Sequence, residues 1–478
     1  MLNRAHKALR EHRVTVYTAA LLCLLFFHML WYVNFFLAES LAGTFFLYPI
    51  PVLAAFYLYF RGLRDGPEIR LLLLFSLWLL ITRVLNGDPA LVREGYLVLD
   101  SLMMALFLSL GLLLDKRGRR ICLNVVSVAA GAFFLALGLL GIYVFVTGAT
   151  LVNPLTEAVT TARLGNVGFY RLTLLGVNPN TTALWFFFSA CLMAYQFFAC
   201  RRKLWRVPIV LCALVDYLAV AACGSRKVKI AFSVSLALLL CIVAVRALMR
   251  RDHRLRALAA ALILLTSIPL CYLSFNAATK AMGSLRASPS VQTGEPAPQA
   301  AQGQGRYYAG QLTARPLARR TDSAAFSDSR GVLEDSGREQ IFRAALESLR
   351  RQPQRLWKGC LFEDRMTVAD ELLTERFPNF HNTLLDVLNY TGIPGLLLLL
   401  AFLILLTARI LQLLFAPVAA VEDRLLVLPL IGALVYSMLE PLFFFCYDFR
   451  ALLSFLFAGF VIACARETEK APDGEQAR

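Results

Sequence analysis

The 478-residue chain is too apolar for a soluble domain, because 58% of its residues are hydrophobic and only 17% are charged. A soluble domain averages about 45–50% apolar and about 25% charged residues. The formal net charge of +16 would suit a nucleic-acid partner, but the Lys and Arg residues fall in short clusters between apolar runs, as the positive-inside rule describes. We therefore expect an all-α, polytopic membrane helix bundle that lies in a lipid bilayer and has no nucleic-acid partner.

Apolar runs long enough to cross a bilayer, roughly 17–25 residues each, recur along the chain and predict about twelve transmembrane helices. They lie near residues 14–37, 41–60, 69–85, 97–114, 121–147, 181–200, 207–223, 229–248, 257–277, 392–415, 425–440 and 450–465. The first run follows the basic segment Met1–Arg13, as in a signal peptide. It is long enough to span and lacks a small-residue cleavage site, so we interpret it as an uncleaved anchor.

The distribution of basic residues predicts the orientation of these helices. Alternate connections are strongly basic, as at Arg61–Arg70, Lys116–Arg120 and Arg201–Arg206, whereas Asn86–Tyr96 carries little positive charge. Since basic connections stay in the cytoplasm, we expect both termini there. The segments expected on the extracytoplasmic side are 148–180, 224–228, 278–391 and 440–449.

The longest predicted outer segment, 278–391, divides the chain. About nine helices precede it in an N-terminal bundle over residues 1–277, further transmembrane helices follow at 392–466, and a cytoplasmic tail occupies 467–478. Residues 287–305 are rich in Ser, Pro, Gln, Ala and Gly and predict disorder.

After residue 335 the outer segment is expected to be helical. Apolar residues at helical spacing predict an amphipathic helix within Asp335–Leu356. Its predicted apolar stripe is Ile341, Phe342, Ala345, Leu346 and Leu349. A second short helix is expected over Asn382–Asn389, ahead of Gly392 and Pro394, which begin the next span.

His381, within Phe377–Leu385, is the only one of the five histidines predicted on the outer face away from a basic cluster. The other four lie in Arg-rich segments or in the first apolar run: His6, His12, His253 and His28. An imidazole can accept a proton at neutral pH, so His381 is the first candidate for a general base. It could equally be a solvated residue in the first turn of a helix capped by Asn379.

The connection Cys223–Lys229 carries three cations, Arg226, Lys227 and Lys229, on the predicted outer side. One explanation is an error in the predicted topology, or Lys229 extending to the membrane interface. The other is a site for an anion such as phosphate, whose oxygens the planar guanidinium of arginine can bind in pairs.

Acidic residues that could assist His381 lie at the outer end of the last helices, at Glu440 and Asp448. Either could support the imidazole, and Glu440 is a candidate for a catalytic role. Arg83 and Asp216 fall within predicted spans, where structural pairing is expected. The 11 cysteines show no metal-ligand spacing, so neither a metal site nor a disulfide framework is expected.

Several motifs, in order over roughly residues 160–400, resemble the bacterial O-antigen ligase and polysaccharide polymerase family. They are Gly176–Asn180, Gly224–Arg226, Ser336–Arg338, His381–Leu385 and Gly392–Leu396. That family shows an Asn-Pro-Asn turn, a Ser-Arg-Gly helix start, a Gly-Arg helix start in a long periplasmic loop, and a His-Asn pair before a glycine-rich helix start. The chain departs from this pattern at Lys227, where the family favours glycine, and at Lys358–Cys360, where a Gly-Val-Gly turn is common.

The resemblance implies a glycosyltransferase at the outer face of the bacterial cytoplasmic membrane. The donor would be a glycan on undecaprenyl pyrophosphate, and the acceptor would be a hydroxyl of a glycan or glycolipid. Arg226 and Arg338 would bind the pyrophosphate with Lys227 and Arg171, and His381 would be the base. Pyrophosphate is a good leaving group once its charge is neutralised, so we expect inverting transfer without a metal or cofactor.

Two other functions fit the same sequence. A polymerase of the same family would join polysaccharide repeat units instead of ligating a finished glycan. A lipid-linked oligosaccharide transporter, a different class, would also need a helix bundle with cationic sites, but such transporters often contain internal repeats, and we find none in this chain.

Overall fold

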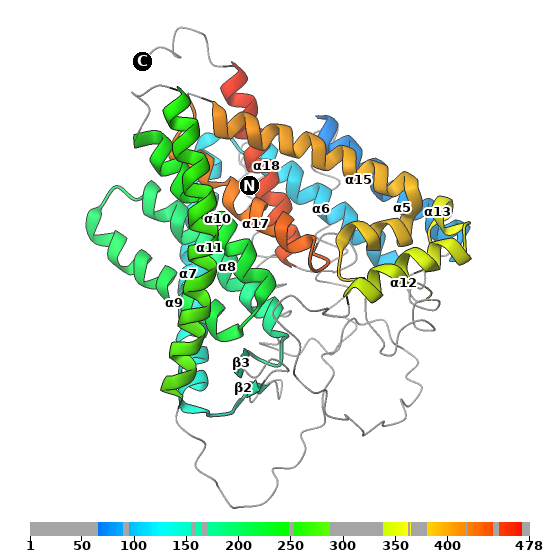
Figure 1. Ribbon diagram of the computed structural model, residues 1–478. Helices are drawn as coiled ribbons and strands as arrows, with labels where there is room; N and C mark the ends of the chain where they lie inside the picture. The colour runs from blue at the N-terminus through cyan, green and yellow to red at the C-terminus, as the bar shows by residue number, and fades with distance from the viewer. Residues whose placement is uncertain are drawn as a thin grey trace, which may run out of the picture.

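The computed structural model describes residues 66–88, 95–153, 159–164, 170–247, 253–286, 338–361, 364, 380–416, 418–442 and 449–470. Regular structure in these ranges is almost entirely helical (Figure 1). Seven of the helices are long and apolar enough to cross a membrane. The protein is therefore an all-α membrane bundle in its described part, as the composition predicts.

Most of the predicted spans coincide with helices of the bundle. The seven spanning helices are α7 (Lys116–Thr147), α8 (Pro179–Ala199), α9 (Arg206–Cys223), α10 (Arg226–Ala247), α11 (His253–Leu285), α15 (Thr383–Phe415) and α18 (Phe449–Lys470). Three more helices also lie on predicted spans: α5 (Pro67–Leu85), α6 (Gly95–Leu113) and α17 (Val427–Ser437). The predicted spans 14–37 and 41–60 lie outside the described residues, so the total of about twelve stays a prediction.

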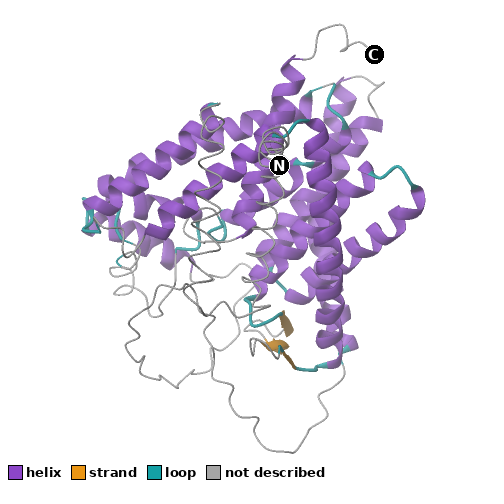
Figure 2. Cartoon of the chain, turned by 180° about the vertical axis from the view of Figure 1, so that it is seen from behind, coloured by secondary structure: helices purple, strands orange, loops and turns teal. Residues whose placement is uncertain are grey.

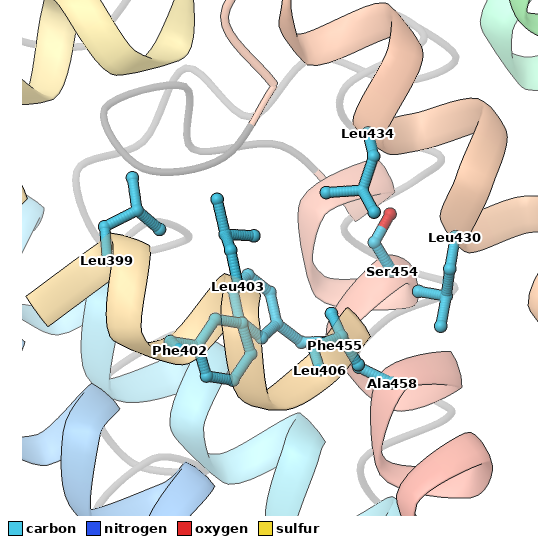
Figure 3. A pocket seen from close by; sticks show the side chains of 9 residues that line it. All are labelled: Leu399, Phe402, Leu403, Leu406, Leu430, Leu434, Ser454, Phe455 and Ala458. Atoms are coloured by element: carbon cyan, nitrogen blue, oxygen red, sulfur yellow. The ribbon is translucent and has the colours of Figure 1, made fainter. Parts of the chain in front are cut away.

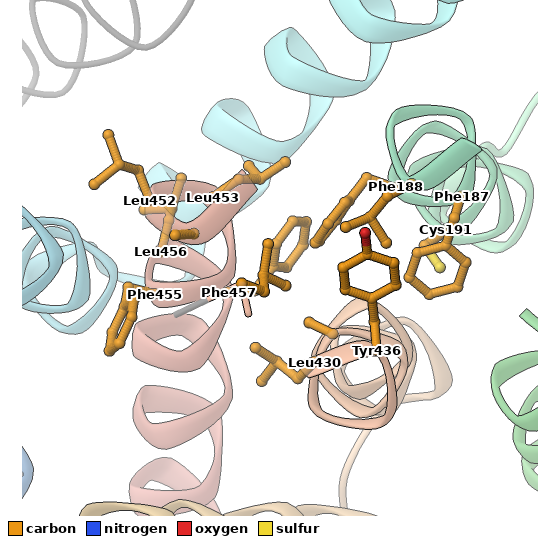
Figure 4. Packing of buried hydrophobic residues seen from close by; sticks show 14 of the residues in the cluster. Phe187, Phe188, Cys191, Leu430, Tyr436, Leu452, Leu453, Phe455, Leu456 and Phe457 are labelled. Atoms are coloured by element: carbon orange, nitrogen blue, oxygen red, sulfur yellow. The ribbon is translucent and has the colours of Figure 1, made fainter. Parts of the chain in front are cut away.

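The core forms where α8, α17 and α18 meet, and these helices are buried by other helices over much of their length (Figure 4). Phe187 and Phe188 of α8 lie beside Tyr436 of α17 and Phe457 of α18, and all four side chains are buried. The peripheral helices α9 and α11 instead carry exposed leucines and valines on their outer faces, as helices in contact with lipid do.

A small antiparallel sheet interrupts the helical pattern between α7 and α8 (Figure 2). It has the order β1-β2-β3, formed by Leu151–Val152, Val159–Leu164 and Tyr170–Thr173, with Ala162 opposite Leu172. Leu172 is completely buried against α7. The sequence predicts no strands within 148–180, because those found there are too short to show a clear alternation.

The helices alternate in direction, so that charged side chains gather at one end of the bundle. There the buried carboxylate of Glu68 in α5 pairs with Arg409 of α15 at 3.3 Å and Arg466 of α18 at 2.6 Å. Arg119 of α7 pairs with Glu467 of α18 at 2.5 Å. We call this the basic end, and the opposite end, with the sheet and the starts of α10 and α15, the site end.

A sharp kink at Gly392 divides α15 into a short helix, Thr383–Thr391, and a longer membrane-spanning part (Figure 1). Gly392 has φ +67° and ψ −171°, which only glycine adopts without strain. The turn after α13 (Arg355–Lys358) packs against this kink, and Gly359 lies so close that an added Cβ would be 2.0 Å from the Tyr390 carbonyl oxygen. The predicted short helix and the break before the next span are thus confirmed.

The amphipathic helix predicted within Asp335–Leu356 is α12 (Arg338–Arg351), followed by α13. Its buried face is Ile341, Ala344, Ala345, Ser348 and Leu349, whereas Leu346 is 56% exposed. The predicted stripe was therefore wrong at Leu346, because burial follows the i, i+3, i+4, i+7 and i+8 positions of a regular helix.

Two predicted boundaries fall inside helices. Helix α11 continues to Leu285, past the predicted end of the N-terminal bundle at 277, and α18 continues to Lys470, past the predicted start of the tail at 467. The predicted disordered stretch 287–305 lies outside the described residues. The connecting elements that complete the described helices are η2 (Lys203–Trp205) and α16 (Val421–Leu425).

The kink gives a first testable prediction. Gly392→Ala would force an L-residue to a positive φ and place its Cβ 2.7 Å from the Leu356 carbonyl oxygen, so we expect a loss of on the order of 1–3 kcal/mol in unfolding free energy. Gly283→Ala in α11 is the control, since no atom lies within 4 Å of the added Cβ. Equilibrium unfolding in detergent micelles measures both variants, and equal stabilities would contradict the role of the kink.

Candidate functional site

Three helix ends bring His381, Glu440 and Lys227 together at the site end. His381 precedes α15, Glu440 follows α17, and Lys227 lies in the first turn of α10. The Nδ1 atom of His381 lies 3.2 Å from Oε2 of Glu440, and Nζ of Lys227 forms an ion pair with the same oxygen. The side chains are 20%, 20% and 12% exposed, respectively. A half-buried carboxylate therefore lies between an imidazole and an ammonium group.

The backbone of His381 is in the left-handed region, with φ +53°. Few residues other than glycine adopt this conformation, although histidine, asparagine and aspartate do so more often than most. Such strain persists only where the surrounding structure fixes it, and it is common at functional sites. The conformation of His381 therefore supports a role for this residue beyond packing.

Asn382 fixes this conformation from the next position. Its Oδ1 accepts hydrogen bonds from the amides of Leu384 at 2.9 Å and Leu385 at 3.1 Å, so it is the N-cap of α15. Its Nδ2 donates to the Met438 carbonyl oxygen at 3.0 Å, which ties α15 to the end of α17. The cap is thus Asn382, whereas the predicted alternative, Asn379, lies outside the described residues.

Helix α12 packs beside the residue that precedes His381. The completely buried Phe380 contacts Ile341 and Ala345 of α12, and Leu385 lies against the same cluster. Helix α12 begins at Arg338, as predicted, and so starts close to the site. The side chains of Arg338 and Asp448 lie outside what the structure describes, so the predicted roles of both stay predictions.

Arg171 and Arg226 lie near the start of α10, and we call these two residues the cationic cluster. Nε of Arg171 donates to the Cys223 carbonyl oxygen at 3.1 Å and Nη2 donates to Oδ1 of Asn180 at 2.8 Å, which joins strand β3 to the Asn-Pro-Asn turn and to the end of α9. Burial lowers the pKa of Arg171, and the charge of the neighbouring Arg226 lowers it further. Among the described residues no carboxylate pairs with either arginine.

Helix α10 adds its own positive potential to this cluster. Ser225 precedes the helix, and its Oγ accepts from the Val228 amide at 3.4 Å. Arg226, the first helical residue, is exposed. The N-terminus of a helix attracts anions through its free amides and its dipole. The combination of this terminus with two unneutralised arginines favours a phosphate-like ligand.

The side chain of Lys229 is buried between α10 and α11. It is 4% exposed, and its Nζ donates to Thr279 Oγ1 at 2.9 Å and to Asn276 Oδ1 at 3.3 Å, both in α11. The alternative in which Lys229 extends to the membrane interface is therefore wrong. Lys229 instead adds a buried positive charge beneath the arginine cluster.

An apolar cavity opens between the helices that carry His381 and Glu440 (Figure 3). It lies between α15, α17 and α18, and Ser454 provides its single polar side chain. The other lining residues are Leu399, Phe402, Leu403, Leu406, Leu430, Leu434, Phe455 and Ala458. The cavity holds only about 20 Å³, roughly the space of one water molecule, and its apolar lining offers nothing to a charged ligand.

Lys227, predicted to bind pyrophosphate, pairs with Glu440 through its ammonium group. Its predicted role toward pyrophosphate stays a prediction. Asn382 and Asn180 are further site residues for which no contact was predicted, although an asparagine just before a helix is a known cap signal. In the described part of the chain no group of three or more His, Cys, Asp or Glu residues could hold a metal ion.

The fold and the site together define a helical membrane protein with a histidine–carboxylate pair and a cationic cluster at one end of the bundle. No protein-family model, curated protein or solved structure matches the chain. The likeness to O-antigen ligases and polymerases therefore depends on the ordered motifs, and its functional content is a proposal.

The cap of α15 gives the second prediction. Asn382→Ala loses both the cap and the bond to Met438, so we expect a loss of about 0.5–2 kcal/mol in unfolding free energy. Asn382→Asp keeps the acceptor for the two amides and loses only the donor, so its stability should lie between those of the alanine variant and the wild type. Unfolding in detergent tests this order, and an aspartate variant no better than alanine would contradict the capping role.

Proposed function

We propose that the protein is a glycosyltransferase that moves a glycan from undecaprenyl pyrophosphate to an acceptor hydroxyl at the outer face of the bacterial cytoplasmic membrane. One observation carries the proposal: an imidazole held by a carboxylate lies at the end of a membrane helix beside cations that attract phosphate. The imidazole would serve acid–base catalysis, and the cations would stabilise the leaving pyrophosphate. The transfer reaction needs both kinds of group side by side.

The cationic cluster would stabilise the departing pyrophosphate. Arg226 begins α10, and Arg171 of β3 lies close to it through its bond to the Cys223 carbonyl oxygen. The dipole of α10 adds to the positive charge of both arginines. Arg338, at the start of α12, is proposed as the cation that closes over the donor from the other side. Fixed positive groups of this kind lower the energy of the charge that develops on the leaving oxygen.

His381 would activate the acceptor. Its Nδ1 faces Glu440, and Nε2 is the atom proposed to take the proton of the acceptor hydroxyl. As the acceptor oxygen bonds to the anomeric carbon, the bond from this carbon to the pyrophosphate oxygen breaks and the configuration inverts. Glu440 orients the ring and stabilises the imidazolium, while Lys227 holds the carboxylate in place.

The proposed orientation of the chain follows from its two ends. We assign the basic end, with the network around Glu68, to the cytoplasm and the site end to the outside. This assignment matches both termini in the cytoplasm and a bundle of about twelve spans.

The third prediction concerns the base. In proteoliposomes with an undecaprenyl-pyrophosphate glycan, His381→Ala should lower the transfer rate about 10²–10⁴-fold. His253→Ala is the matched control, because His253 begins α11 at the other end of the bundle, and it should transfer normally. Full transfer by His381→Ala would refute the role of the base.

Two sets of acceptors in this assay separate the related activities. Transfer to a lipid A–core glycolipid identifies a ligase, and growth of the glycan on its own repeat unit identifies a polymerase. Movement of the labelled donor between leaflets without any transfer would instead favour the transporter.

The carboxylate of Glu440, which contacts both His381 and Lys227, gives the fourth prediction. Two variants should shift the pH profile of the transfer rate in opposite directions. Removing its charge in Glu440→Gln disfavours the imidazolium, so the acid limb of the transfer rate should move to lower pH. Removing the competing cation in Lys227→Met favours the imidazolium, so the acid limb should move to higher pH. Shifts in the same direction, or none in either variant, would contradict the arrangement.

A further inference from the structure

We propose that Arg83 is a positioning residue for the transfer reaction, because it fixes the short helix that presents His381. The proposal rests on the proposed function and adds a residue of another helix, α5, that the proposed mechanism does not use. Arg83 is in the last turn of α5 and is completely buried. A buried guanidinium is costly unless its donors are used, so the bonds that it makes are informative.

Arg83 donates from Nη2 to two carbonyl oxygens that come from separate segments. The bond to Tyr390 is 2.7 Å and the bond to Cys360 is 2.8 Å. In an unbroken helix the Tyr390 carbonyl would accept from the amide of residue 394, but this residue is Pro394, which has no N–H. Arg83 therefore supplies a donor that the sequence of α15 cannot.

Two further side chains of α5 hold the same region. Nε1 of Trp78 donates to the Thr391 carbonyl oxygen at 2.7 Å, next to the kink at Gly392. Nδ2 of Asn86 donates to the Lys358 carbonyl oxygen at 2.8 Å. Together with Arg83, these residues bind the end of the short helix Thr383–Thr391 and the α13 turn to one face of α5 (Figure 1).

The short helix is thus fixed at both ends. At its start Asn382 binds the Met438 carbonyl, and at its end α5 binds the two carbonyls before the kink. A nine-residue helix is about 13 Å long, so a tilt of about 5° at the kink would displace His381 by roughly 1 Å. A displacement of this size can lower a reaction rate on the order of 10²-fold.

The test compares Arg83 with a second buried arginine, Arg424 of α16. Arg424 is 6% exposed and donates to the Ala416 carbonyl oxygen at 2.6 Å, just past the other end of α15. Arg83→Met and Arg424→Met therefore each remove one buried arginine, the first bound to a carbonyl within α15 and the second to the carbonyl of its C-cap, Ala416. We expect both to lower the thermal midpoint, whereas only Arg83→Met lowers kcat.

The expected kcat of Arg83→Met is about 10–100-fold below wild type, with the KM for the lipid-linked donor within about twofold because the cationic cluster is intact. Arg83→Lys, which keeps one donor, should recover part of the rate. Where Arg83→Met does not fold, Trp78→Phe removes only the bond to Thr391 and should lower kcat in the same way. A fall in kcat that is equal in Arg83→Met and Arg424→Met, or a rise in KM alone, would overturn the proposal.

The same assay separates this proposal from the proposed function. The positioning role alone is refuted if the wild-type protein transfers the glycan, the His381→Ala variant does not, and the Arg83→Met variant keeps the wild-type kcat. When wild type itself transfers no glycan, both are refuted.

Discussion

The site depends on one carboxylate oxygen, Oε2 of Glu440, which contacts both Lys227 and His381. These residues belong to three segments that the chain brings together only when α10, α15 and α17 pack. A half-buried carboxylate or ammonium group without a partner would be strongly destabilising. The ion pair therefore stabilises the junction of the three helices, and it places the imidazole where a neighbouring negative charge can support its protonation.

The strained backbone of His381 is held by contacts on every side of the short helix. Asn382 binds the end of α17, Phe380 packs on α12, and Arg83 holds the far end through Tyr390. The kink at Gly392 separates this helix from the membrane-spanning part of α15. His381 thus precedes a short helix that is fixed at both ends.

The sequence predicts those features of the fold that depend on local pattern. Apolar runs locate ten of the described helices, from α5 to α18, and Gly392 with Pro394 locates the break in α15. The predicted face of α12 includes Leu346, which is exposed, and omits Ala344, which is buried. The pattern favoured the leucine because it is the larger apolar residue of the two. Contacts between distant residues have no local signal: the scarcity of histidine pointed to His381, yet nothing in the sequence pairs Lys227 with Glu440 rather than with a ligand.

The central claim is that the donor pyrophosphate binds beside His381 at the site end. The most direct measurement is an electron cryomicroscopy map of the protein in a lipid nanodisc with a non-transferable phosphonate analogue of the undecaprenyl-pyrophosphate glycan. The account predicts phosphate density against Arg226 and Arg171 at the start of α10, with the anomeric carbon of the sugar facing His381. Phosphate density at the basic end, or a sugar remote from His381 with the cationic cluster unoccupied, would contradict it.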